Sequence, residues 1–224
     1  PTKIARVRET DYLNHKEIFG PGGLAVDVHI SPEQLITHYV ERLIDYPDAL
    51  QVLDFADGKV QLVAVKAFYG GPLIGQALRA FEDYLPNVET RIAAMFRRGK
   101  AIIPEGNTLI EVGDEVFFIA ATQHIRTVMA ALRELDRPCK RIIIAGGGNT
   151  GTRLASALEK KYHVKLIEHN ANRTEIISEI LDKTIVLQGD VADEDLLREE
   201  NIDETDIFCA ITNDDQINIL SAML

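Results

Sequence analysis

The chain has 224 residues, 46% of them hydrophobic and 26% charged, a balance that is ordinary for a globular protein of one large or two small domains. Its formal net charge of −11 argues against a nucleic-acid partner, because an acidic surface repels the phosphate backbone. No apolar run approaches the roughly 20 residues that span a bilayer, and Cys139 and Cys209 have no metal-like or disulfide spacing, which is typical of a reducing, cytoplasmic setting.

The first predicted elements lie before residue 49. Residues 3–8 read as a strand with no earlier strand to pair with, and residues 217–224 form an apolar helical stretch without a capping glycine. We therefore expect a piece of a longer polypeptide. Ser31 and Pro32 predict a helix start, with Ser31 as the N-cap and Pro32 at the first helical position, and the helix is expected to run to about Ile44.

Residues 49–136 are predicted to form a small α+β domain. The glycine-rich segment 69–75 lacks a lysine and is interpreted as a structural turn rather than a phosphate loop. Arg97, Arg98 and Lys100 are interpreted as a solvated cluster in a turn between strands. The expected strands are 49–55, 59–68, 88–96, 108–110 and 115–121, the expected helices are 72–84 and 123–135, and the expected boundary is 136–138.

From Arg141 onward, strand and helix patterns alternate, which is typical of a parallel α/β sheet. The strands are continuously apolar, as expected for a sheet that is buried on both faces. We therefore predict a partial doubly wound (Rossmann) domain over residues 140–224. The expected strands are 141–145, 164–168, 184–188 and 206–211, and the expected helices are 149–161, 171–182, 193–200 and 214–224.

The most specific motif is a glycine turn that follows the first of these strands. Gly146 permits the tight turn, Gly148 lets the backbone approach a pyrophosphate, and Gly151 lets the helix pack closely on the strand. The helix that begins near Asn149 directs its free amides and its dipole at the bound anion. Glu168, 20 residues after Gly148, is placed to accept hydrogen bonds from ribose hydroxyls and to repel a 2′-phosphate. The motif predicts dinucleotide binding and favours NAD(H) over NADP(H).

Two later segments are expected at the same edge of the sheet. Asp190 follows the third strand, and it either lines the adenine pocket or caps the next helix. Thr212 and Asn213 follow the fourth strand, at the switch point where open α/β sheets bind ligands. Asn213 or Asp214 is also expected to cap the last helix, which is compatible with ligand contact.

No catalytic set accompanies this site. Hydride transfer needs an acid–base residue that faces the nicotinamide, yet none of the six histidines has a carboxylate or cysteine partner at a relay or metal spacing. His163 and His169, which flank a strand, are interpreted as exposed rather than catalytic. The balance favours a binding protein, with an NAD-dependent oxidoreductase fragment as the alternative.

Together these motifs resemble the regulator-of-potassium-conductance (RCK, or KTN) domain family. The glycine turn, Glu168, residues 189–190 and residues 211–219 resemble its nucleotide-binding domain, RCK_N. Residues 71–75 and 103–118 resemble its carboxyl-terminal partner domain, RCK_C. The order, with the RCK_C-like domain first and the RCK_N-like domain second, is similar to the middle of the tandem-repeat regulatory subunits of bacterial Trk potassium uptake systems.

The resemblance implies a non-enzymatic cytoplasmic subunit, peripheral on the inner face of the cell membrane, that gates a potassium-conducting Trk membrane protein. Members of the family form homo-oligomeric rings and bind NAD(H) or the adenine nucleotides ATP and ADP as effectors, and the ligand favours one ring geometry. Residues 1–48 would be the end of a preceding nucleotide fold and its crossover helix. The implied ligands of the second nucleotide site are Gly146, Gly147, Gly148, Asn149, Thr150, Glu168, Thr212 and Asn213, and Arg6 is implied for the first site.

Overall fold

The computed structural model describes residues 2–7, 23, 26–135 and 139–223. Arg8, the expected boundary 136–138 and Leu224 lie outside the described residues. The chain forms two compact units, one made of Pro1–Glu41 with Cys139–Leu224 and the other of Arg42–Pro138. Among the described residues, no helix combines the length and the apolar character needed to span a bilayer.

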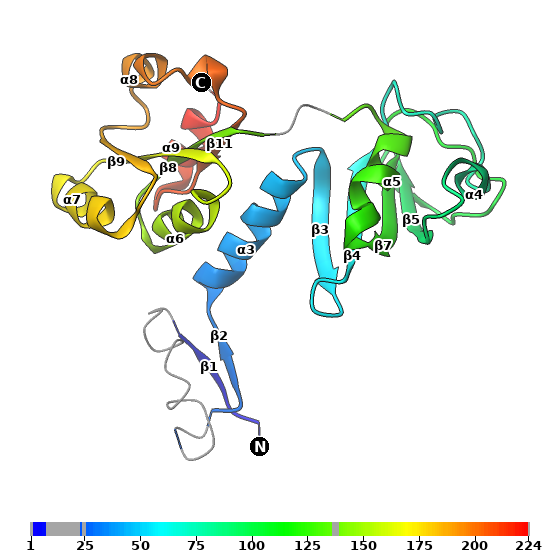
Figure 1. The fold of residues 1–224 in the computed structure, drawn as a ribbon, viewed down its shortest axis with the longest axis horizontal. Helices are drawn as coiled ribbons and strands as arrows, with labels where there is room; N and C mark the ends of the chain where they lie inside the picture. The colour runs from blue at the N-terminus through cyan, green and yellow to red at the C-terminus, as the bar shows by residue number, and fades with distance from the viewer. Residues whose placement is uncertain (1, 8–22, 24–25, 136–138, 224) are drawn as a thin grey trace. The chain divides into compact units, whose positions relative to one another are not determined.

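The first unit contains a four-stranded sheet in which every neighbouring pair is parallel, in the order β10-β9-β8-β11 (Figure 1). The chain leaves the central strand β8 toward β9 and β10 and then returns to β11 on the other side of β8. This order is that of a doubly wound sheet and confirms the predicted fold class; its switch point lies between β8 and β11. The strands are β8 (Arg141–Ala145), β9 (His163–Glu168), β10 (Ile185–Gln188) and β11 (Ile207–Ala210).

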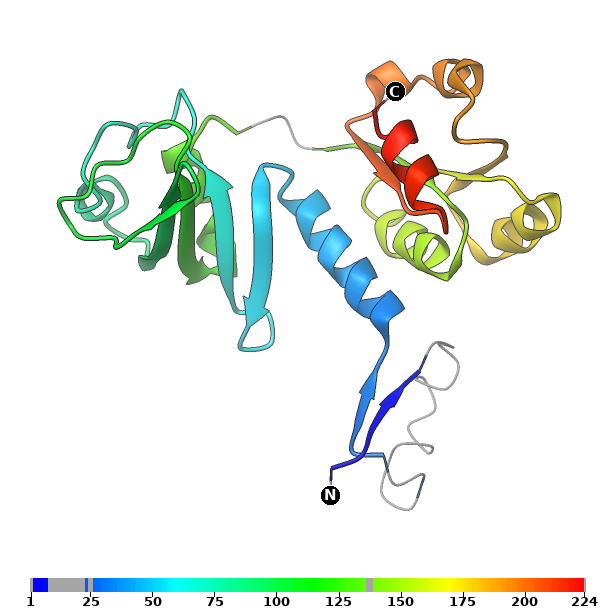
Figure 2. The ribbon, with the colours of Figure 1, turned by 180° about the vertical axis from the view of Figure 1, so that it is seen from behind.

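Helices cover both faces of this sheet because its central strand is apolar on both sides. Ile143 packs with Ile167 and with Leu197 of α8 on one face. On the other face, Gly151 of α6 approaches Ile144. The helix α9 follows β11 and is drawn in red in Figure 2. The helices are α6 (Asn149–Leu158), α7 (Ala171–Ile180), α8 (Glu194–Glu199) and α9 (Asp215–Ser221), each slightly shorter than predicted, with a 3-10 turn η2 (Ile202–Glu204) before β11.

A buried carboxylate fastens the end of α6 to the loop before β10. Glu159 is 6% exposed and accepts backbone hydrogen bonds from Asp182, Lys183 and Thr184, together with one from the Thr184 hydroxyl. Burial acts to raise the pKa of Glu159, but these hydrogen bonds outweigh burial, so its pKa is lowered overall.

Replacing Glu159 with glutamine is expected to lower the free energy of unfolding by about 1–3 kcal/mol near neutral pH, because buried donors lose a charged acceptor. The folded-state pKa is depressed, so this stabilisation is complete above the unfolded pKa and is lost as the pH falls through the folded pKa. Urea denaturation should therefore show a gap in unfolding free energy between the two proteins that narrows as the pH falls below the ordinary glutamate pKa of about 4.3. A gap of constant size across this range would contradict the assignment.

The second unit is built on a five-stranded antiparallel sheet in the order β3-β4-β7-β5-β6. The helix α5 (Ile125–Leu132), preceded by a 3-10 turn η1 (Thr122–His124), covers one face and buries Ile125, Val128 and Leu132 against Val63 and Phe118. The strands are β3 (Ala49–Phe55), β4 (Val60–Lys66), β5 (Thr90–Arg97), β6 (Lys100–Ile102) and β7 (Glu115–Ala121).

The predicted helix over 72–84 is wrong for its first part, because only α4 (Ala80–Tyr84) is helical. The preceding residues form turns that hydrogen-bond to a distant loop: the Gly75 amide donates to the Ile110 carbonyl at 2.7 Å, and the Leu78 amide donates to Thr108 at 2.9 Å. The predicted strand 108–110 is reduced to a single bridge between Ala77 and Leu109, and β6 was not predicted.

The interpretation of Arg97 as part of a solvated cluster is also wrong. Its Nε and Nη2 atoms donate to the two carboxylate oxygens of Asp114, each at 2.8 Å, and Asp114 is fully buried. Asp114 raises the pKa of Arg97 through these hydrogen bonds. Arg98, the next residue, is exposed as expected.

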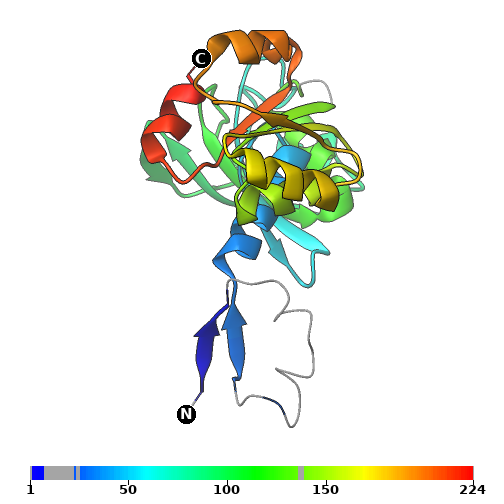
Figure 3. The ribbon, with the colours of Figure 1, turned by 90° about the vertical axis from the view of Figure 1, so that its left-hand side faces the viewer.

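Near the start of the chain, β1 (Ile4–Arg6) pairs in parallel with β2 (Val28–Ile30), and Figure 3 shows the two side by side. The second strand was not predicted. The helix α3 (Pro32–Asp45) begins as predicted, since the Ser31 hydroxyl accepts a hydrogen bond from the Gln34 amide at 3.4 Å.

Candidate functional site

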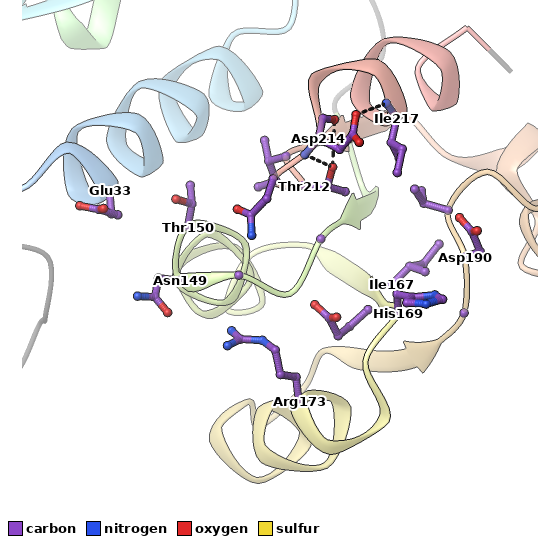
Figure 4. Close-up of a pocket in the computed structure, with 17 residues that line it drawn as sticks. Glu33, Asn149, Thr150, Ile167, His169, Arg173, Asp190, Thr212, Asp214 and Ile217 are labelled. Atoms are coloured by element: carbon purple, nitrogen blue, oxygen red, sulfur yellow. Dashed lines mark hydrogen bonds between the residues drawn. The ribbon is translucent and has the colours of Figure 1, made fainter.

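A cavity of about 620 Å³ opens at the carboxyl ends of β8, β9, β10 and β11 (Figure 4). This is the edge at which doubly wound sheets bind ligands. The sequence-predicted residues that line it are Gly146, Gly148, Asn149, Thr150, Glu168, Asp190, Thr212 and Asn213. The other three predicted residues, Gly147, Gly151 and Arg6, are not among its lining residues.

The three motif glycines differ in what a side chain would meet. At Gly146, φ is +111°, and a Cβ would come within 3.0 Å of the backbone of Ile211 and Thr212. At Gly151, a Cβ would lie 1.9 Å from the Gly146 carbonyl oxygen. At Gly148, by contrast, a Cβ would meet nothing within 4 Å. Packing within the protein therefore explains why Gly146 and Gly151 are glycines, whereas Gly148 faces open space in the cavity.

The amino end of α6 also differs from those of the other helices in this unit. Asn170, Asp193 and Asp214 each accept backbone hydrogen bonds at the starts of α7, α8 and α9. The cap of α6 is Gly148, which provides no side chain for its first amides. The helix end therefore presents N–H groups and the positive end of its dipole at the cavity, an arrangement suited to an anion.

Glu168 stands at the end of β9, on the side of the cavity opposite the β11 loop. Its Oε2 atom accepts the Gly147 amide at 2.9 Å, and its Oε1 atom accepts the Asn170 amide at 2.8 Å. Each carboxylate oxygen keeps a further lone pair for a ligand hydroxyl. The contacts hold the carboxylate in one orientation beside the glycine turn.

The loop after β11 is held by the side chain of Asn218, which lies within the segment 211–219 and for which the sequence predicted no role. The Asn218 carboxamide oxygen accepts both the Thr212 amide and the Thr212 hydroxyl at 2.8 Å, and its nitrogen donates to the Thr212 carbonyl at 3.1 Å. The Asp214 amide donates to the Thr212 hydroxyl as well. Thr212 is thereby fixed against Gly146, and Asp214, rather than Asn213, caps α9.

Asp190 lines the cavity and does not cap α8. The N-cap of α8 is Asp193, whose Oδ1 atom accepts the amides of Asp195 and Leu196. Asp190 lines the cavity and accepts the Ala192 amide at 2.9 Å in the turn before the helix. The capping interpretation is wrong.

Three features of the site escaped the sequence analysis. Arg173 of α7 lines the cavity and donates from Nη2 to the Gly147 carbonyl at 2.7 Å. His169, interpreted as merely exposed, also lines the cavity. Gly147 occupies a variable position of the motif, yet a Cβ there would lie 2.5 Å from Ile177 and 2.7 Å from a Glu168 oxygen. The roles of Arg173 and Gly147 depend on contacts across the turn that no local pattern reveals, whereas His169 directly follows Glu168 in the sequence.

Arg6, implied for a different nucleotide site, belongs to β1. Its guanidinium lies 3.8 Å from the carboxylate of Glu33, and Glu33 lines the cavity. Arg6 itself is not among the residues that line the cavity.

Comparison with known families assigns both parts of the chain. Residues 62–133 match the TrkA-C domain, and residues 142–224 match the TrkA-N domain. Among solved structures, the GsuK RCK domain is similar with a TM-score of 0.59 and 20% identity, over 99% of this chain and 46% of that one. A GsuK channel bound to NAD is similar with a TM-score of 0.59 and 18% identity, over 97% of this chain and 37% of that one. These likenesses concern the fold.

Relatives in other organisms match from end to end. Proteins named Trk system potassium uptake protein TrkA are 56% identical over 225 residues in Vibrio alginolyticus and 56% identical over 224 residues in Halomonas elongata. In each case the match covers 100% of this chain and 49% of the relative, so the chain spans about half the length of these relatives. The resemblance drawn from the sequence is confirmed: the chain belongs to the TrkA family, with a TrkA-C domain followed by a TrkA-N domain.

Proposed function

We propose that this chain is the nucleotide-sensing part of a regulatory subunit of a Trk potassium uptake system, and that it binds NAD(H) as an effector without turnover. The observation that carries the proposal is the open side of Gly148. The protein's own packing does not require a glycine at this position, whereas a pyrophosphate lying against the backbone does.

Different residues of the cavity bind different parts of the dinucleotide. The uncapped amides of α6 hold the pyrophosphate, aided by the helix dipole. Glu168 accepts hydrogen bonds from the adenosine ribose, since its carboxylate is already oriented by Gly147 and Asn170. Thr212 and Asn213 form the opposite wall at the switch point. ATP and ADP share the adenosine diphosphate portion of NAD(H), so they compete for the same site.

Several features support binding without catalysis. The carboxylates of Glu168, Asp190 and Asp214 each accept local backbone amides, which ties them to the shape of the loops. Neither thiol is activated, since burial raises the pKa of both Cys139 and Cys209 to about 11. A bound NAD(H) would supply hydride chemistry, but the carboxylates that line the cavity are arranged to hold a ligand.

The partner in this proposal is the potassium-conducting membrane protein of the Trk system, with the chain at the inner face of the membrane in a ring of copies. Support comes from the names of the relatives and from the fold shared with the GsuK channel. A nucleotide acts on such an assembly only if it binds one ring geometry more tightly than another, and its differential affinity sets the size of the shift.

The proposal is tested by calorimetric titration of the purified protein with NADH and with ATP. Replacing Glu168 with alanine is expected to weaken NADH binding by about 1–3 kcal/mol, the cost of a lost hydrogen bond to a charged group. Glu179→Ala removes the same charge from an exposed position on α7 outside the cavity and serves as the matched control.

Two results would contradict the proposal. One is a wild-type protein that binds neither NADH nor ATP. The other is a loss of NADH absorbance when a metabolite is added, which would show that NADH is oxidised. An unchanged NADH affinity in Glu168→Ala would remove Glu168 from the site.

A further inference from the structure

The cavity contains a cation that the dinucleotide motif does not account for. Of the described residues that line it, Arg173 is the one with a permanent positive charge. Figure 4 shows its side chain extending from α7 toward the start of α6, where Asn149 lies. No acidic side chain among the described residues forms an ion pair with Arg173; its hydrogen bond goes to the Gly147 carbonyl.

Arg173 and Glu168 meet at the same residue of the glycine turn. Glu168 accepts the Gly147 amide at 2.9 Å, and Arg173 donates to the Gly147 carbonyl at 2.7 Å. A carboxylate and a guanidinium are thus both hydrogen-bonded to Gly147, beside the place where Glu168 would meet a ribose. One guanidinium N–H group is used by Gly147, and the guanidinium has four others to offer.

These two charges have opposite effects on a phosphate carried by the ribose. A carboxylate at the end of the second strand repels a 2′-phosphate, whereas an arginine nearby accommodates it. An arginine also binds phosphate through two parallel hydrogen bonds, which a single ammonium group cannot reproduce. Glu168 alone predicts a site that excludes 2′-phosphorylated nucleotides. Glu168 together with the neighbouring Arg173 guanidinium predicts a site that admits them.

We propose that Arg173 is the specificity-determining residue at the ribose end of this site, and that it opens the site to the 2′-phosphorylated dinucleotides NADP(H) alongside NAD(H). The inference rests on the proposed function, since it concerns the same cavity. The regulatory subunit then responds to the combined nicotinamide nucleotide pool, and Arg173 sets the relative weight of the phosphorylated form.

The test compares the dissociation constants of NADH and NADPH by calorimetry in the wild type, Arg173→Ala and Arg173→Lys. We expect the wild type to bind NADPH within about tenfold of NADH. Arg173→Ala should raise the NADPH constant by about 10- to 100-fold, the loss of a charge-assisted hydrogen bond, and the NADH constant by less than about threefold. Arg173→Lys should fall between the two, because it keeps the charge and loses the paired geometry.

The ratio of the two constants is the readout because both ligands use the same glycine turn. Any disturbance of Gly147 in the Arg173 variants then affects both ligands and cancels. Arg198→Ala removes one exposed cation of α8 that pairs with Glu194, and it should leave the ratio unchanged.

The outcomes separate the two proposals. If the wild type binds NADH but NADPH is weaker by more than about 100-fold, the site excludes the 2′-phosphate and the inference about Arg173 is overturned while the proposed function stands. The same holds if Arg173→Ala leaves the NADPH to NADH ratio unchanged. If the wild type binds neither dinucleotide, both proposals are overturned.

Discussion

Replacing Gly151 with alanine is expected to lower the free energy of unfolding of the nucleotide fold by about 3 kcal/mol, at the upper end of what overpacking costs. The new Cβ would lie 1.9 Å from the Gly146 carbonyl oxygen and 3.1 Å from its carbon, and both atoms belong to the backbone. The turn cannot retreat, because the Gly146 amide donates to the Ile167 carbonyl at 2.9 Å and Thr212 lies against its other side. Helix α6 would have to shift away from β8.

Gly148→Ala is the matched control, three residues earlier in the same turn. Its Cβ would meet no atom within 4 Å, and its φ of −65° suits any residue, so a change of less than about 1 kcal/mol is expected. Hydrogen exchange of the β8 and β9 amides measures the stability of this unit separately from the antiparallel unit. Equal protection in the two variants would contradict the packing described for Gly151.

Replacing Arg97 with alanine is expected to destabilise the antiparallel unit by about 3–5 kcal/mol, because it leaves a buried carboxylate without its counter-charge. Asp114 is fully buried and takes two hydrogen bonds from Arg97, in addition to the Glu111 amide at 2.9 Å. The arginine also donates to the Leu109 carbonyl at 2.8 Å, which ties β5 to the loop before β7.

Arg98→Ala removes the same charge one residue further along, where the side chain is exposed, and should change stability by less than about 0.5 kcal/mol. Chemical denaturation, together with hydrogen exchange of the β4 and β7 amides, compares the stability of the two variants. An equal loss of stability in the two variants would contradict the role assigned to the Arg97–Asp114 pair.

The elements that the sequence predicted well are those whose signals are local. The apolar run 141–145, the glycine turn and the helix after it are written within a few residues of one another, and the structure places them within a residue or two of the expected bounds except at the end of α6. Ser31 and Pro32 mark the start of α3 in the same local way.

The errors arose where distant contacts override the local pattern. Residues 72–79 have the apolar spacing of a helix, but Gly75 has φ of +79° and its amide bonds to Ile110, 35 residues away. Arg97 finds its partner 17 residues along the chain, across a hairpin. A pattern confined to a short window of residues contains neither partner.

In the site, too, the residues with local signals were predicted and those that depend on distant contacts were not. Gly146, Gly148 and Glu168 could be chosen by spacing, because a dinucleotide fixes the distance between the turn and the second strand. Arg173 could not, since its role depends on a hydrogen bond to Gly147, 26 residues earlier. Asn218 reaches back six residues to hold Thr212, an arrangement that only the folded loop reveals.

Calorimetric titration of NADH into the wild type and the Gly148→Ala variant tests most directly whether the glycine turn holds a dinucleotide. Gly106→Ala serves as the control, because a Cβ there has only an ordinary contact, 3.8 Å from Arg79. We expect saturable NADH binding in the wild type and in Gly106→Ala, and no saturation of Gly148→Ala at the concentration that fills the wild-type site. Equal NADH affinity in all three proteins, or no binding to the wild type, would contradict the claim that this turn holds a dinucleotide.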